Sequence, residues 1–227
     1  MKIGIIGAGF IGRPLATLAV KAGHEVMMSN SRGRDTLLST AVAVGCKVGS
    51  SQEAAEFGEV VFVAIPLKNV SSIPAAPLAG KIVVDANNYY PHRDGNIAAL
   101  DANTTTTSEL LAQHLKGAKV VKAFNAILQG DLEKDGRPAG TADRRALPIA
   151  GDDAEAKKVV GALIDAFGFD VVDAGPLAEG WRFQRAKPAY CIPFDIKGMK
   201  QALAAAERNV ELPDGSWRHR FVPQVER

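Results

Sequence analysis

A glycine-rich turn stands near the N-terminus, between an apolar run and a helical pattern. Residues 1–6 are mostly apolar with β-branched side chains, and from Ile11 onward apolar residues recur at helical spacing. The turn between them reads Gly7-Ala8-Gly9-Phe10-Ile11-Gly12. In such a strand, turn and helix, the first glycine permits the tight turn, the second lets the backbone approach a pyrophosphate, and the third lets the helix pack close to the strand. The pattern predicts a dinucleotide site at a helix N-terminus, against the alternative of a glycine turn in an unrelated α/β protein.

The segment after a second predicted strand, residues 25–28, indicates which dinucleotide binds. An NAD enzyme places an Asp or Glu there, on the ribose hydroxyls. This chain instead carries Asn30, Ser31, Arg32 and Arg34. A carboxylate would repel a 2′-phosphate, whereas hydroxyl donors and a guanidinium group bind one, so we predict NADP as the cofactor. The alternative is that Arg32 and Arg34 are solvated loop charges, and for Arg34 both interpretations stand.

Composition excludes several classes of function. The chain has 227 residues, of which 47% are hydrophobic, enough to bury a full core. Its formal net charge of +2 gives no field suited to nucleic acid. No stretch approaches the roughly 18 apolar residues of a membrane span, and the early first strand leaves no room for a signal peptide. Cys46 and Cys191 lack metal-ligand spacing, so we expect reduced thiols in a cytoplasmic protein. From the charge and the lack of a membrane span, we expect no nucleic-acid or membrane partner.

Strand and helix patterns alternate along the first 125 residues. This alternation predicts a doubly wound parallel α/β sheet of the Rossmann type. We assign residues 1–128 to a dinucleotide-binding domain and residues 129–227 to a small C-terminal α/β extension that completes a pocket for a second substrate. Within this plan we expect Ser108 to cap a helix, residues 129–145 to form a surface excursion, and residues 189–206 to be mostly helical.

Polar residues follow several of the predicted strands. Ligands of an open α/β sheet bind outside the carboxyl ends of its strands, a rule that selects, besides the two segments above, Ile65 with Pro66, Asn87 with Asn88, and Asn125. The asparagine amides could bind ribose, phosphate or a nicotinamide carboxamide. Their alternative role is local turn chemistry, because Asn tolerates the left-handed conformation and bonds its own backbone.

None of these positions supplies an acid, a base or a nucleophile, so we predict no catalytic side chain. The four histidines are His24, His92, His114 and His219. They lack the spacing of a metal site, so we predict no metal. Lys122 lies close to Asn125 in sequence, but strand alternation would turn it out of the site. A redox enzyme of this kind would align two reactive rings and leave the chemistry to its cofactors.

Six segments carry a family resemblance: residues 7–12, Ser31-Arg32, residues 85–88, 121–125, 151–153 and 173–177. Together they resemble the NADPH-dependent reductases of the deazaflavin coenzyme F420, a family whose fold also occurs in the cytoplasmic domain of the STEAP metalloreductases. The resemblance implies NADP on the first domain, a C-terminal portion that helps to form the pocket for a second ring, and direct hydride transfer between nicotinamide and deazaflavin. Asn125 stands where archaeal members carry a histidine, so coenzyme F420 and another flavin both remain as second substrates. The tail from about residue 211 has no counterpart in the family.

The leading hypothesis is an NADP(H)-dependent oxidoreductase that transfers hydride between nicotinamide and a flavin or deazaflavin, its small-molecule redox partner. We expect a homodimer. A second hypothesis is an NADPH-dependent reductase of a small carbonyl or imine, related to the β-hydroxyacid dehydrogenases and imine reductases. Those enzymes need a large helical second domain, and the residues after the first domain of this chain are too few for one. The hypothesis therefore requires that dimerisation complete the site. A third is a non-catalytic NADP(H)-binding sensor, which the absence of an acid–base group permits.

Overall fold

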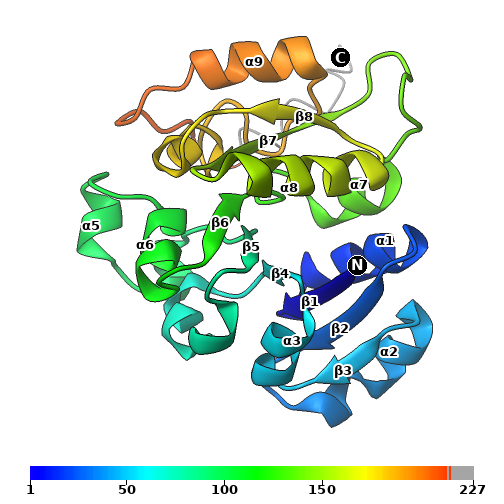
Figure 1. The fold of residues 1–227 in the computed structure, drawn as a ribbon. Helices are drawn as coiled ribbons and strands as arrows, with labels where there is room; N and C mark the ends of the chain where they lie inside the picture. Colours follow the sequence, from blue (N-terminus) through cyan, green and yellow to red (C-terminus); the bar gives the residue numbers. More distant parts are fainter. Residues whose placement is uncertain (214, 216–227) are drawn as a thin grey trace, which may run out of the picture.

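The computed structural model describes residues 1–213 and residue 215, which build an α/β fold around one sheet (Figure 1). The strands are β1 (Lys2–Ile6), β2 (Glu25–Ser29), β3 (Lys47–Gly49), β4 (Val60–Val63), β5 (Ile82–Asp85), β6 (Lys119–Lys122), β7 (Ala146–Gly151) and β8 (Asp170–Asp173). Their order across the sheet is β3-β2-β1-β4-β5-β6-β7-β8. All adjacent strands are parallel except β6 and β7, which are antiparallel. The predicted doubly wound sheet is confirmed, except that β7 and β8, which are parallel to each other, run opposite to β1–β6.

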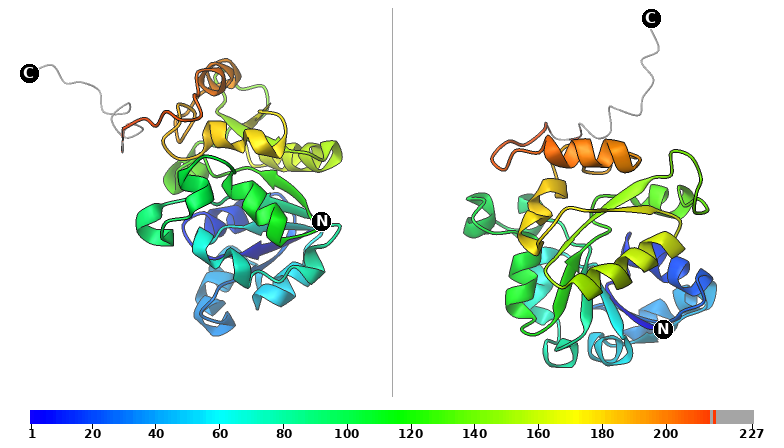
Figure 2. Two further views of the ribbon diagram at one scale, coloured as in Figure 1. Left: turned by 90° about the vertical axis from the view of Figure 1, so that its left-hand side faces the viewer. Right: turned by 45° about the horizontal axis from the view of Figure 1, so that its top comes forward.

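Helices cover both faces of the sheet (Figure 2). The α-helices are α1 (Gly12–Lys21), α2 (Leu38–Val44), α3 (Ser51–Phe57), α4 (Pro91–Asp94), α5 (Ala98–Asp101), α6 (Thr107–His114), α7 (Gln129–Lys134), α8 (Ala154–Ala166) and α9 (Ile196–Ala204). Short 3-10 helices are η1 (Arg34–Leu37), η2 (Leu67–Ser72), η3 (Ala76–Leu78) and η4 (Leu177–Phe183). Because parallel strands between two helical layers bury both faces, their sequences read as continuous apolar runs rather than as an alternation.

Strand β4 shows how one apolar run serves two cores. Val60 and Phe62 pack with α1, α7 and α8 on one face, while Val61 and Val63 pack with α3 and α6 on the other. Beyond β6, helices α8 and α9 lie on opposite faces of β7 and β8 (Figure 1), with Met199 of α9 in a third apolar cluster. The sheet is therefore a rigid platform, and the ends of its strands hold their loops in fixed positions.

The helix caps agree only in part with the sequence expectations. Ser108 was predicted as a cap, but Thr106 caps α6 instead: its hydroxyl accepts the Glu109 N–H at 3.1 Å, and the Glu109 carboxylate accepts the Thr106 N–H. The Ser108 side chain is used elsewhere, since its hydroxyl donates to Asp85. A hydroxyl at position 106 and one at position 108 look alike in sequence, and the tertiary contact with Asp85 decides between them.

Two other expectations for the C-terminal portion are wrong. Residues 129–145 are not only a surface excursion, because they begin with α7, whose acidic side chains form ion pairs with the buried Arg145. Residues 189–206 contain helix only at Ile196–Ala204, where the Asp195 carboxylate accepts the Gly198 N–H at 2.7 Å. Cys191 has a positive φ of 57°, so the chain before Pro193 cannot be helical.

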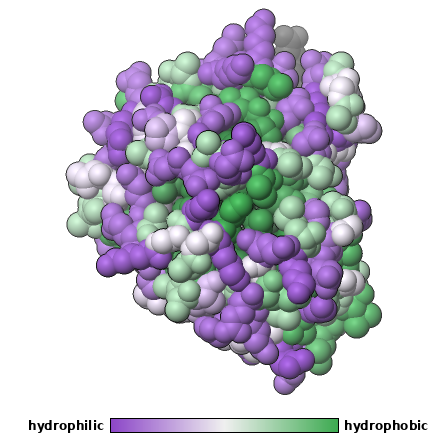
Figure 3. All heavy atoms as spheres, viewed as in Figure 1, coloured by the Kyte–Doolittle hydropathy of each residue, from purple (hydrophilic) through white to green (hydrophobic). Residues whose placement is uncertain are grey.

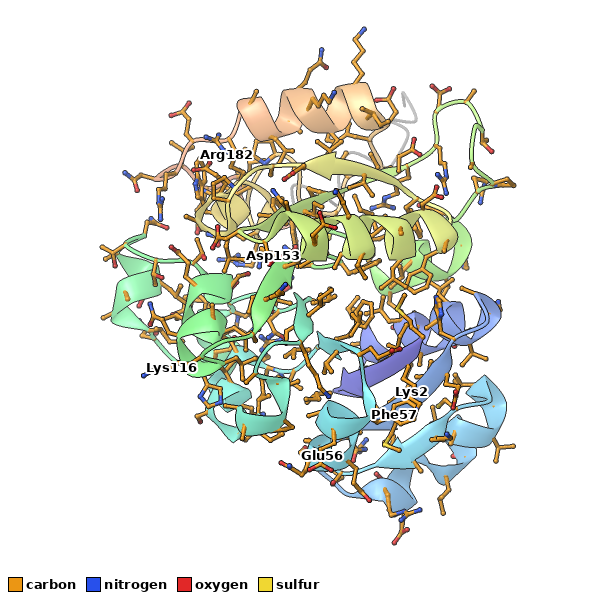
Figure 4. The ribbon with its side chains drawn as sticks, in the orientation of Figure 1. Lys2, Glu56, Phe57, Lys116, Asp153 and Arg182 are labelled. Carbon is orange, nitrogen blue, oxygen red and sulfur yellow. The ribbon has the colours of Figure 1, made fainter. Side chains whose placement is uncertain are left out.

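At the amino ends of β1 and β6, side-chain contacts join the strands to neighbouring helices. Lys2 and Phe57 lie side by side there (Figure 4), with the Lys2 ammonium 5.6 Å from the centre of the Phe57 ring. Asp153, also labelled in Figure 4, caps α8 by accepting the Ala156 N–H, and forms an ion pair with Lys119 at 3.0 Å. These contacts keep the amino ends of β1 and β6 in place, away from the candidate site.

The surface is mostly hydrophilic on the face shown in Figure 3, with apolar residues visible over α2. Leu38 and Val42 of that helix are 51% and 86% exposed. Among the described residues, no helix is long and apolar enough to cross a membrane. His219 and most of the C-terminal tail lie outside the described residues.

Candidate functional site

The glycine turn lies where the order of the strands changes direction, between β1 and β4. Gly7 has a φ of 113°, and a Cβ there would come within 2.2 Å of the Ala64 carbonyl oxygen. A Cβ on Gly12 would come within 1.7 Å of the Gly7 carbonyl oxygen. Gly7 and Gly12 are therefore required by the fold itself, whatever binds to the turn.

Gly9 is different, because a Cβ built on it meets no atom within 4 Å. Its backbone is exposed at the start of α1, whose first N–H groups have no partner within the helix. Nothing in the folded chain explains a glycine at this position. Close approach of a ligand does, and the N-terminus of α1 makes an anion such as pyrophosphate the suitable ligand.

Arg13 is a candidate residue that the sequence reasoning missed. Its Nε donates a hydrogen bond to the Ala8 carbonyl oxygen at 2.9 Å, so the guanidinium group lies against the glycine turn. The signal was available, because Arg13 directly follows the last glycine of the motif. A cation beside the turn strengthens the site for a negatively charged ligand.

The loop after β2 presents its predicted residues to solvent. Ser31, Arg32 and Arg34 are exposed, while Asn30 shapes the loop: its Oδ1 accepts the Arg32 N–H at 3.0 Å and its Nδ2 donates to the Thr36 hydroxyl. Hydrogen bonds from Ser50 lower the pKa of Glu53, and the positive charge of Arg34 adds to this effect. Arg34 thus lies near Glu53 of α3.

A cavity of about 440 Å³ connects the glycine turn with the carboxyl ends of β4, β5 and β6. Its wall includes eight of the residues selected from the sequence, which are Gly9, Phe10, Ile11, Ile65, Pro66, Asn87, Asn88 and Asn125. Gly7, Ala8 and Gly12 lie behind this wall in the turn, and the loop of residues 30–34 is not part of it. Apolar side chains make up much of the lining, with a few polar groups among them, as in sites for planar ring systems.

Two amide atoms at this cavity lack a partner. The Asn87 Oδ1 accepts the Ile65 N–H at 2.9 Å, while its Nδ2 is buried without a hydrogen bond to any described residue. The Asn125 Nδ2 donates to the Phe183 carbonyl oxygen and to Asn88, while its Oδ1 is buried without one. One spare donor and one spare acceptor are therefore left. A primary carboxamide has the complementary acceptor and donor.

A pair of tyrosines also lines the cavity, and nothing in the sequence pointed to it. The hydroxyl oxygens of Tyr90 and Tyr190 are 2.7 Å apart, joining segments one hundred residues apart. Arg93 stacks over the Tyr90 ring at 4.7 Å and donates to the Asn88 carbonyl oxygen. Burial raises the pKa of the Tyr190 phenol far above its ordinary value, which makes it a poor proton donor at neutral pH.

Lys122 points away from the cavity, as strand alternation predicted, but it is not a surface residue. It is fully buried, and its Nζ donates to the Asn87 carbonyl oxygen at 3.2 Å and to the Thr107 hydroxyl at 2.9 Å. The carboxylate of Asp85, also fully buried, lies 3.8 Å from Nζ. Burial lowers the pKa of the Lys122 ammonium, and the charge of Asp85 opposes that shift.

The other candidates for chemistry lie outside the cavity. His92 is exposed, the His114 ring bonds the Ile73 carbonyl oxygen, and burial lowers the pKa of His24 near the N-terminus. In the described part of the chain, no cluster of three metal-ligating side chains occurs. Burial raises the pKa of the Cys191 thiol to about 12, so it is not a thiolate at neutral pH.

The chain is similar to one family model and to several known proteins. A sequence model of the family described as NADP oxidoreductase, coenzyme F420-dependent, matches residues 2–89. The hypothetical protein SMa0349 of Sinorhizobium meliloti has a TM-score of 0.73 at 32% identity, with 85% of this chain and 94% of that chain covered. A protein of Arthrobacter sp. FB24, described as a candidate F420-dependent NADP reductase, has a TM-score of 0.67 at 29% identity, with 78% and 85% covered.

A mammalian protein is also similar in sequence. The chain is 34% identical over 200 residues to metalloreductase STEAP3 of Rattus norvegicus, which covers 85% of this chain. The chain spans only 38% of the length of that rat protein.

Proposed function

Because the chain belongs to the family of coenzyme F420-dependent NADP oxidoreductases, we propose that it transfers hydride between NADP(H) and a flavin or deazaflavin. The observation that carries the proposal is one cavity that joins an open glycine turn to two unpartnered amide atoms. The turn suits a pyrophosphate, and the amides suit a carboxamide. A nicotinamide dinucleotide has both groups in one molecule.

Each part of the site has a separate task in this proposal. The backbone around Gly9 and the N-terminus of α1 would hold the pyrophosphate, and Ser31 with Arg32 would hold the 2′-phosphate. Asn87 and Asn125 would orient the nicotinamide ring, whose role when bound is to supply or accept the hydride. Phe10, Ile65 and other apolar side chains of the wall would pack against the bound rings.

The side chains at the cavity favour ring-to-ring transfer over proton-coupled reduction of a carbonyl. Its described lining contains no histidine, lysine, cysteine or carboxylic acid. Of its ionisable groups, Arg93 is paired with Asp94, the hydroxyls of Tyr90 and Tyr190 are hydrogen-bonded to each other, and the pKa of Tyr190 is raised by burial. Hydride transfer between stacked rings needs alignment at roughly 3 to 3.5 Å rather than a protein acid.

The acceptor is tested by stopped-flow oxidation of NADPH against coenzyme F420, FMN, FAD, riboflavin and a set of small aldehydes, ketones and imines. We expect rapid single-turnover oxidation with at least one flavin or deazaflavin and none with the carbonyls and imines. Oxidation by carbonyls or imines alone would replace the proposal with the small-substrate reductase. Tight binding of NADPH without oxidation by any acceptor would favour a sensor.

Cofactor choice gives a separate prediction. Arg32→Ala should weaken NADPH binding by about tenfold to a hundredfold, the range for a lost hydrogen bond to a charged group, and should leave NADH binding unchanged. Arg34→Ala is the matched control, because Arg34 lies near Glu53 and should matter much less. Calorimetric titration of both variants with both cofactors makes the measurement. Equal affinities for NADPH and NADH in the unmutated protein would contradict the assignment.

The homodimer and the cytoplasmic location expected from the sequence remain proposals. Cys46 and Cys191 are both free thiols, in keeping with a reducing compartment.

A further inference from the structure

All polar atoms of Asn87 but one form hydrogen bonds with other described residues. Its backbone N–H donates to Asp85 Oδ1 at 3.0 Å, and its carbonyl oxygen accepts from Lys122 at 3.2 Å. Its side-chain Oδ1 accepts the Ile65 N–H at 2.9 Å. Only Nδ2 has no partner among the described residues. The orientation of the amide is thereby determined, because Ile65 offers a donor and must meet the oxygen.

The groups that hold the Asn87 backbone form a buried charged network. Lys122 and Asp85 both have fully buried side chains, and Lys122 also donates to the hydroxyls of Thr107 and Ser108. Ser108 in turn donates to Asp85 Oδ2 at 2.5 Å. Removing two charges from water is expensive, and a buried ion pair seldom stabilises a fold more than apolar residues would. Stability alone is therefore a weak reason for this network.

We propose that Lys122 and Asp85 are positioning residues, which hold the peptide of Asn87 so that its free Nδ2 meets the carboxamide oxygen of a bound nicotinamide. The inference rests on the proposed function and deepens it. Neither residue touches the cavity, whose lining includes Asn87 but not Lys122 or Asp85. They act through the two peptide bonds of Asn87, one on its N–H and the other on its carbonyl oxygen.

The test compares two ligands that share one end. NADPH reaches from the glycine turn to Asn87, whereas 2′,5′-ADP has the 2′-phosphate and adenosine but no nicotinamide. The main variant is Lys122→Met with Asp85→Asn, which removes both charges and leaves neither one buried alone. We expect this double variant to bind NADPH about tenfold more weakly, the effect of one lost hydrogen bond, and 2′,5′-ADP within about twofold of the unmutated protein.

Two further variants keep the result interpretable. Thr107→Val removes one partner of Lys122 at nearly constant volume, and should weaken NADPH binding by about threefold even if the double variant does not fold. Lys187→Met is the matched control, since Lys187 is also a buried lysine that donates to backbone carbonyls, those of residues 207, 208 and 210. It should lower the thermal stability and leave both affinities unchanged.

The outcomes separate this inference from the function on which it rests. Equal weakening of both ligands, or unchanged NADPH binding in the folded variants, would overturn the positioning role and leave the oxidoreductase assignment intact. An unmutated protein that binds neither ligand would overturn the proposed function itself.

Discussion

Gly9→Val is expected to weaken NADPH binding by at least about a hundredfold while the thermal unfolding of the protein stays nearly unchanged. A Cβ at this position meets no atom of the described residues within 4 Å, and the backbone φ of Gly9 is not positive. The branched side chain would instead occupy the space that the pyrophosphate needs. Calorimetric titration with NADPH and a thermal melt of the same sample separate binding from folding.

Gly12→Ala is the matched control for this experiment. Its methyl group would lie 1.7 Å from the Gly7 carbonyl oxygen, so the turn must open and the protein should unfold at a much lower temperature. The two glycines belong to one motif and yet should fail in different ways. Undiminished NADPH binding by a folded Gly9→Val protein would show that the dinucleotide does not bind at this turn.

A large effect on stability is also expected from Asp131→Asn combined with Asp135→Asn. Asp131 lies in α7 and Asp135 follows its last residue, and they form ion pairs of 2.8 and 2.7 Å with Arg145, a side chain that is 4% exposed. Without them the guanidinium group would be buried and unpaired, which destabilises a protein by about 3 kcal/mol or more. For a chain of this length the melting temperature should fall by about 6 to 12 °C.

Arg145→Met tests whether the unpaired charge is the cause. It removes the cation and keeps an apolar side chain of similar length, so it should destabilise the protein much less than the double aspartate variant does. Scanning calorimetry of the two variants gives the comparison directly. A loss as large in Arg145→Met as in the double variant would show that the side chain acts through packing and hydrogen bonds rather than through charge balance.

Several local features of the fold follow from short stretches of sequence. The capping box of Ser50 and Glu53 at the start of α3 was predictable because both partners lie within four residues. The apolar run of β4 is typical of a strand covered on both faces, and the glycine turn indicated the strand, turn and helix at the N-terminus. In each case the interacting groups are neighbours along the chain, so their spacing carries the information.

The predictions that were wrong concern residues whose partners lie farther away along the chain. Thr106 rather than Ser108 caps α6 because Ser108 is engaged by Asp85, 23 residues earlier in the chain. Helix α7 was missed because Asp131 and Asp135 find their partner at Arg145, 14 and 10 residues later in the chain. Propensity and spacing describe a residue's own neighbourhood, and a tertiary partner can reassign its side chain.

The residues of the candidate site also fall into those that the sequence located and those that only tertiary contacts revealed. The sequence by itself determined the glycine turn, the polar loop after β2 and the asparagines after β5 and β6, because each lies at a strand end that the pattern locates. Only the tertiary structure decided that Tyr190 joins Tyr90 at the cavity and that Lys122 holds Asn87 from behind. The physical reason is distance along the chain: these contacts join residues 100 and 35 positions apart, and only the packed sheet and its helices bring them together.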